Sequence, residues 1–160
     1  MIQFLKACLL IKWMVFTVTF LFTIILCILL CLSSISDIRN RTIPNVIVVM
    51  ILVFGIFYSF LHHSLYNALL GVIIPSIPLL VAKYKFNFFI GAGDIKLLSA
   101  IGAWLSWFLN LYVLLLSCVI VLIFVLIMRL LFRTRVLSVP FAPFLSIASL
   151  IIYIVSVNSI

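Results

Sequence analysis

Long apolar runs, separated by short polar segments, take up nearly the whole 160-residue chain. Each run has the roughly 20 residues that a helix needs to cross a hydrocarbon core about 30 Å thick. Because 69% of the residues are hydrophobic, polar side chains are too few to cover a water-soluble fold. A membrane barrel would instead show short segments of alternating polarity. We therefore expect an all-α, polytopic membrane protein with about six transmembrane helices and no soluble domain.

Proline, glycine and polar residues divide the chain into six segments, which leave no room for a second domain. We expect one integral-membrane domain over residues 1–160. The first run continues to Leu32, too far for a signal peptide, so we interpret it as a span. The third segment contains Pro75 and Pro78, and we expect it and the short fourth to be kinked or partly buried. The expected helices are Trp13–Ser34, Pro44–Leu61, Leu65–Ala82, Asp94–Leu109, Leu111–Met128 and Pro140–Val157.

Basic residues dominate the charge, with ten Lys and Arg against two acidic residues. In a six-span arrangement eight of these basic residues fall on one side of the membrane, and only Lys6 and Lys12 fall on the other. Those two lysines fit either a snorkelling interfacial segment or an extra half-span. The positive-inside rule therefore predicts cytoplasmic first, third and fifth loops and external termini. This rule explains the net charge without a nucleic-acid partner and adds an attraction to membrane lipids with anionic headgroups. The basic residues on the expected cytoplasmic side are Arg39, Arg41, Lys83, Lys85, Lys96, Arg129, Arg133 and Arg135.

Several chemistries are excluded by the residues that the chain lacks. It contains no glutamate, which rules out an HExxH metalloprotease. His62 and His63 are the only histidines and fall on the side opposite both acids, so we expect neither a metal site nor a Ser-His-Asp triad. The cysteines lie inside apolar runs without a CxxC pair, and we expect no metal, disulfide or cofactor from them. They are Cys8, Cys27, Cys31 and Cys118.

Asp37 and Asp94 remain, and the expected topology places both on the cytoplasmic face. Two carboxylates held close together share a proton, so that one activates water while the other protonates a scissile carbonyl, as in aspartic proteases. Taken singly, Asp37 also fits a helix-end pair with Arg41, and Asp94 fits a helix N-cap reached through Gly91 and Gly93. Acidic residues at membrane depth are usually functional, and a proton- or cation-coupled transporter is a second interpretation.

Three motifs resemble those of the type IV prepilin peptidases, which are GxGD-type membrane aspartic proteases. They are SDIRNRTIPN at residues 36–45, GAGDIK at 91–96 and VPFAPFL at 139–145, in the order found in the family. The resemblance implies that Asp37 and Asp94 are the catalytic pair. It also implies a substrate, a prepilin or pseudopilin with a basic leader and an apolar stem, cleaved after a glycine at the cytoplasmic boundary of a prokaryotic inner membrane.

Neighbouring residues receive supporting roles as hypotheses. Gly91 and Gly93 would let a substrate backbone approach Asp94. Lys96 would contact Asp94 or the substrate, or simply snorkel. Pro44 would fix the loop after Asp37. Pro140 and Pro143 would open and bend the last helix. The candidate substrate-binding or supporting residues are Gly91, Gly93, Lys96, Arg39, Arg41, Pro44 and Asn45.

The sequence departs from the longer members of the family in one respect. Those members carry a segment with paired CxxC motifs, associated with N-methylation, and this sequence has no such motif. We therefore expect peptidase activity without N-methyltransferase activity. The short form resembles both the tight-adherence prepilin peptidases and the archaeal preflagellin peptidases. A non-catalytic pilus assembly factor of the same fold is a further alternative.

Overall fold

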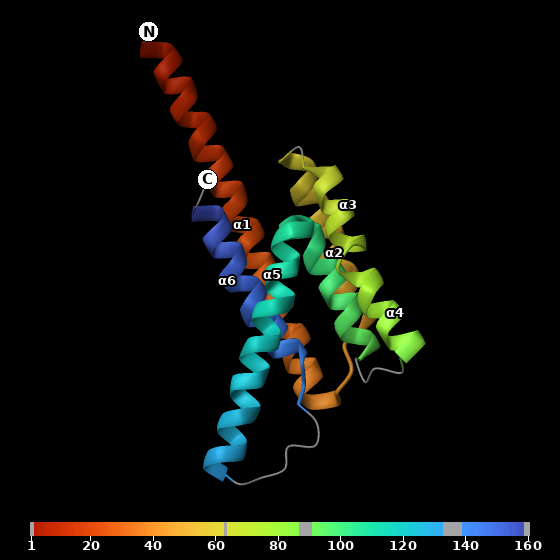
Figure 1. The fold of residues 1–160 in the computed structure, drawn as a ribbon. Coiled ribbons are helices and arrows are strands. Elements are labelled where there is room, and N and C mark those ends of the chain that lie inside the picture. The colour runs from red at the N-terminus through yellow and green to blue at the C-terminus, as the bar shows by residue number, and fades with distance from the viewer. Residues whose placement is uncertain (1, 63, 87–90, 133–138, 159–160) are drawn as a thin grey trace.

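Helices make up all the regular structure in the described part of the chain (Figure 1). The structure is a computed structural model that describes residues 2–62, 64–86, 91–132 and 139–158. The side chains of residues 2–12, 15, 86, 132 and 158 fall outside this description. The helices are α1 (Ile2–Asn40), α2 (Asn45–Leu61), α3 (Leu65–Ile73), α4 (Ser76–Phe86), α5 (Ala92–Phe132) and α6 (Ala142–Asn158).

The expected all-α membrane protein is confirmed. Three stretches are long and apolar enough to cross a bilayer, and α2 and α6 are shorter apolar helices. Large apolar side chains face outwards over most of the molecule, which suits contact with lipid tails. Trp13 and Phe16, for example, are 68% and 66% exposed on the part of α1 that extends beyond the other helices in Figure 1. The three long stretches are Phe16–Asn40, Leu65–Lys85 and Ala92–Leu131.

The first helix is longer than the sequence predicted, because it continues past Ser34 to Asn40. Ser33 and Ser34 fit inside the helix, since their hydroxyls donate to the Leu30 carbonyl at 2.9 and 2.8 Å. This extension places Asp37 inside the helix, not in a loop. At its other end α1 runs without a break through Lys6 and Lys12, so no separate half-span exists there, and their side chains lie outside the described set.

The third predicted segment is broken at Ile74 and Pro75 into α3 and α4, as the prolines indicated. The Ser76 hydroxyl lies 2.6 Å from the Ser99 hydroxyl of α5 and fastens the start of α4 to that helix. Beyond this contact α4 leans away from the bundle in Figure 1.

The fourth and fifth predicted segments form α5, which reverses direction in the middle (Figure 1). The reversal lies at Ser106, whose backbone is not helical (φ 66°, ψ 171°), four residues before the turn expected at Asn110. The two halves, residues 92–105 and 107–132, therefore run antiparallel. Asn110 supports the turn, because its Nδ2 donates to the carbonyls of Gly71 at 3.1 Å and Leu98 at 3.0 Å.

One end of the molecule gathers the end of α1, the start of α2, the end of α4, both ends of α5 and the start of α6 (lower end of Figure 1). We name it the basic end, after the described Lys and Arg side chains that it carries. The predicted members Arg133 and Arg135 lie outside the described residues. The described ones are Arg39, Arg41, Lys83, Lys85, Lys96 and Arg129.

Candidate active site

Asp37 lies near the end of α1, and its side chain is held by another helix. The residue is only 8% exposed, and its Oδ2 accepts a hydrogen bond of 3.1 Å from the backbone N–H of Ala142, the first residue of α6. The first N–H groups of a helix have no partner within the helix, so the carboxylate satisfies a donor that would otherwise be unpaired. Arg41 is exposed and has positive φ (53°), and its N–H closes α1 on the Asp37 carbonyl at 2.9 Å. Among the described side chains Asp37 therefore has a backbone partner in place of the Arg41 ion pair that was considered.

Asp94 is the third residue of α5, so it is not the N-cap that one interpretation of the sequence suggested. Gly91 takes the position before the helix, and its carbonyl accepts from the N–H of Ile95 at 3.4 Å. The Asp94 carboxylate folds back over this residue, because a Cβ added to Gly91 would lie 2.6 Å from Asp94 Oδ2. Gly91 thus leaves the space that the carboxylate occupies.

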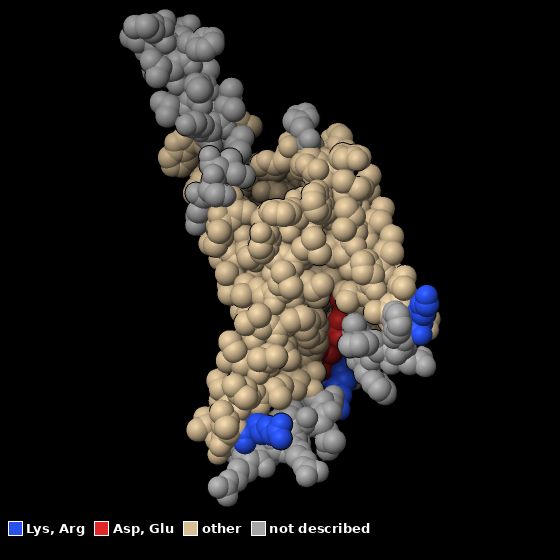
Figure 2. Space-filling model, in the orientation of Figure 1, with Lys and Arg blue, Asp and Glu red and all other residues tan. Residues whose placement is uncertain are grey.

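The two carboxylates come from different helices, α1 and α5, and lie at the basic end, where we call the space between them the gap. They are close enough to interact electrostatically, and Lys83 of α4 also acts on Asp94. Over the described residues, however, no Cα atom of α1 lies within 8 Å of one in α5, and both helices pack against α2 and α6. Figure 2 shows acidic surface in a recess just above basic side chains. Because Asp37 and Asp94 are the only acids in the sequence, this surface belongs to at least one of them. Two carboxyl groups that interact can share a proton, which is the chemistry by which aspartic proteases activate water.

The other candidates lie around this gap. Lys96 Nζ donates to Asn45 Oδ1 at 3.0 Å, which links α5 to the start of α2 on the exposed surface. Pro44 precedes α2 with an extended backbone (φ −60°, ψ 131°), so the helix begins one residue later than expected. Gly93 packs near this loop, because a Cβ added there would touch Ile43 at 3.4 Å.

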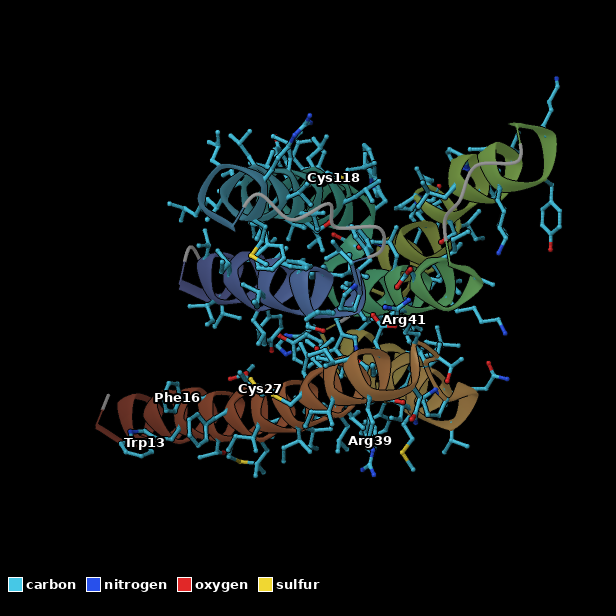
Figure 3. The ribbon with its side chains drawn as sticks, turned by 90° about the horizontal axis from the view of Figure 1, so that it is seen from below. Trp13, Phe16, Cys27, Arg39, Arg41 and Cys118 are labelled. Carbon is cyan, nitrogen blue, oxygen red and sulfur yellow. The ribbon has the colours of Figure 1, made fainter. Side chains whose placement is uncertain are left out.

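Arg39 lies apart from the carboxylates. It is exposed on α1 and points away from the other helices in the view from the basic end (Figure 3). His62 is the C-cap of α2 at the opposite end of the molecule, and its ring centroid lies 4.5 Å from that of Tyr58. His63 is outside the described residues. No group of three or more His, Cys, Asp or Glu that could hold a metal ion occurs in the described ranges.

The sequence did not point to Ala142 as a partner of Asp37. A backbone N–H is present in every residue except proline, so residue type carries no signal for this contact. The nearest signal is the VPFAPFL motif itself. Its prolines open α6, since Pro140 precedes the helix and Pro143 is the second residue, where a missing N–H costs nothing.

Comparison with known proteins agrees with the motifs. Residues 24–126 match the type IV leader peptidase family. The prepilin leader peptidase/N-methyltransferase of Pseudomonas aeruginosa is 32% identical over 123 residues, which cover 72% of this chain and 42% of that relative. The chain therefore spans less than half the length of this curated relative. No solved structure matches the chain. Because the family match covers more than half of the sequence and includes both aspartates, the chain belongs to the type IV leader peptidase family.

Proposed function

We propose that this protein is a membrane aspartic endopeptidase that removes the basic leader peptide of type IV prepilin-like or pseudopilin precursors. The observation that carries the proposal is the meeting of the only two acidic residues in the chain, Asp37 and Asp94, across one gap. The family match and the similarity to a prepilin leader peptidase/N-methyltransferase support the same activity. The proposal concerns only the peptidase part of that name.

In the proposed mechanism the carboxyl groups of Asp37 and Asp94 share one proton and hold a water molecule between them. The ionised partner accepts a proton from this water as it attacks the scissile carbonyl, and the protonated partner donates to the carbonyl oxygen. A tetrahedral intermediate forms, and its collapse breaks the C–N bond. The carboxyl that took the water proton passes it to the new amine, and the other carboxylate regains its proton from the intermediate's hydroxyl, which restores the pair.

The proposed substrate is a precursor whose leader is basic and whose stem is apolar. The stem would lie beside the outward-facing apolar side chains of the bundle, and the cleavage point would lie at the basic end. We propose that this end faces the cytoplasm in a prokaryotic inner membrane, because basic loops remain on the cytoplasmic side. The proposed supporting residues near the cleavage point are Gly91, Gly93, Lys96, Asn45, Pro44 and Arg41. Arg39 points away from the other helices in Figure 3, so we propose no role for it there.

The test replaces each carboxylate by its neutral isostere. We expect Asp37→Asn and Asp94→Asn each to lower leader cleavage of a co-expressed prepilin by at least about 10³-fold, because either change removes half of the acid–base pair. Arg129→Gln is the matched control, because it also removes a charge at the basic end, on an exposed side chain at the far end of α5. The amount of folded protein in the membrane is compared for all three variants.

The other functions considered for the sequence correspond to distinct outcomes. A transporter would show proton or cation flux in liposomes that the same Asn variants abolish, without cleavage by the unaltered protein. A non-catalytic assembly factor would support pilus assembly equally well as either Asn variant. Either outcome would displace the peptidase proposal.

A further inference from the structure

Two serines join α1 to α6 one helical turn away from the contact between Asp37 and Ala142. The Ser34 and Ser146 hydroxyl oxygens lie 2.9 Å apart, and Ser146 lies within donating distance of the Ala142 carbonyl, also at 2.9 Å. Each hydroxyl has one proton, and both also lie within donating distance of the Leu30 carbonyl, Ser34 at 2.8 Å and Ser146 at 3.3 Å. The two hydroxyls therefore form one small network with the carbonyls of Leu30 on α1 and Ala142 on α6. Ser146 is 5% exposed, so water competes little with these bonds.

Both backbone polar groups of Ala142 therefore have a side-chain hydrogen-bond partner. Its N–H holds Asp37 Oδ2 at 3.1 Å, and its carbonyl accepts from the Ser146 hydroxyl. Ser34 lies three residues before Asp37 on α1, and Ser146 lies four residues after Ala142 on α6, so the two contacts are stacked one turn apart. Two contacts at successive turns fix how α1 and α6 are rotated about their axes, whereas one contact would leave that rotation free.

We infer that Ser146, together with Ser34, is a positioning residue for Asp37. It sets the orientation of the carboxylate through the first residue of α6 and touches no reacting atom. The inference rests on the proposed function, in which Asp37 must face Asp94 across the gap. Small errors in the placement of a catalytic group can cost about 100-fold in rate, so a hydroxyl outside the gap is expected to affect turnover.

The test compares Ser146→Thr with Ser146→Val, two side chains of nearly equal shape that differ in the presence of a hydroxyl. We expect Ser146→Thr to cleave a prepilin within about threefold of the unaltered protein, and Ser146→Val to have a kcat lower by about 10- to 100-fold with KM unchanged. Ser149 provides the matched control. It is fully buried on the same helix, and its hydroxyl donates within the helix to the Ser146 carbonyl at 2.8 Å, so Thr and Val at that position are expected to have equal kcat.

A second variant removes the Ala142 N–H directly. Proline is well tolerated at the first position of a helix, so Ala142→Pro deletes the donor while α6 keeps its start. Leu65→Pro places a proline at the first position of α3, at the other end of the molecule, and controls for the substitution itself. We expect a loss of kcat for Ala142→Pro and none for Leu65→Pro.

A chemical measurement reports on Asp37 without relying on proteolysis. The rate at which a carbodiimide couples an amine to Asp37, followed by mass spectrometry, is expected to be several-fold higher in Ser146→Val and Ala142→Pro than in Ser146→Thr and Leu65→Pro. Equal kcat and equal coupling rates within each pair would overturn the inference and leave the peptidase proposal standing. If the unaltered protein does not cleave, the peptidase proposal fails, and the coupling rates alone decide whether Ser146 orients Asp37.

Discussion

At the scale of single residues, Gly91 controls the position of the Asp94 carboxylate. A Cβ at residue 91 would lie 2.6 Å from Asp94 Oδ2, closer than the two atoms can approach, so Gly91→Ala must push the carboxylate out of place. We expect kcat for prepilin cleavage to fall by about 10- to 100-fold, the usual cost of a misplaced catalytic group. The change is measured in steady-state cleavage assays with purified protein.

Gly93 supplies the comparison for this prediction. A Cβ there would meet Ile43 at 3.4 Å, which side-chain adjustment can accommodate, and it would not meet Asp94. Gly93→Ala is therefore expected to lose much less activity than Gly91→Ala. Equal losses for the two variants would mean that the glycines act through the substrate backbone and not through the carboxylate.

At the scale of helices, the reversal within α5 depends on a strained residue. Ser106 has a φ of 66° with a ψ of 171°, a conformation that glycine adopts readily and that costs other residues about 1–3 kcal/mol. Ser106→Gly is expected to raise the free energy of unfolding by about 1 kcal/mol, after the loss of the local bond from its hydroxyl to the Leu105 carbonyl. Thermal unfolding in detergent measures the change.

Ser117, also on α5, provides the control for this substitution. It is fully buried inside the second half of the helix, so Ser117→Gly is expected to destabilise the protein, by roughly 0.5–1 kcal/mol from helix propensity. A lower melting temperature for Ser106→Gly would contradict the assignment of strain to the reversal.

The crossing of α3 and α5 depends on two glycines that bring the backbones together. A Cβ on Gly71 would overlap the carbonyl oxygen of Gly102, and a Cβ on Gly102 would overlap that of Gly71. Asn110 is completely buried and joins the crossing to the turn of α5. We expect Gly71→Ala and Gly102→Ala each to destabilise the fold by about 2–3 kcal/mol and to lower the yield of folded protein. Gly93→Ala is the control, and equal yields from all three variants would refute the close crossing.

Sequence patterns located the helices better than the contacts between them. The apolar segments were predicted because proline, glycine and polar residues interrupt them, and Pro75 broke the third segment as expected. The end of α1 was predicted six residues too early, because Ser33 and Ser34 read as a boundary although their hydroxyls bond within the helix. The turn of α5 lies at Ser106, and a single serine between apolar residues is a weaker turn signal than the asparagine four residues later.

The same difference appears in the site. The aspartates could be proposed as a pair from the sequence because the chain has only two acidic residues, so the prediction did not depend on knowing the distance between them. The contact between Asp37 and Ala142 joins residues 105 positions apart through a backbone donor, and the contact between Ser34 and Ser146 joins residues 112 apart. Neither contact follows from local spacing, since each depends on how α1 and α6 pack.

At the scale of the whole molecule, charge and apolar surface together orient the bundle. The described basic side chains gather at the end that holds Asp37 and Asp94 (Figure 2), whereas His62 lies at the other end, between α2 and α3. The outer faces between the two ends expose large apolar side chains to the lipid. The positive-inside rule therefore predicts that the basic end, and with it the proposed site, faces the cytoplasm.

The last prediction tests this orientation directly in cells. Single cysteines at Thr42 and His62, both exposed and at opposite ends of the bundle, are introduced into a chain whose four native cysteines are replaced by serine. We expect a membrane-impermeant maleimide to label His62→Cys in intact cells with the outer barrier opened, and to label Thr42→Cys only after the inner membrane is permeabilised, because basic loops stay inside. Both variants should label fully in detergent and should still cleave a prepilin, which controls for access and folding. The reverse pattern would place Asp37 and Asp94 at the external face, away from a leader peptide that stays in the cytoplasm, and would contradict the proposed topology and the proposed substrate together.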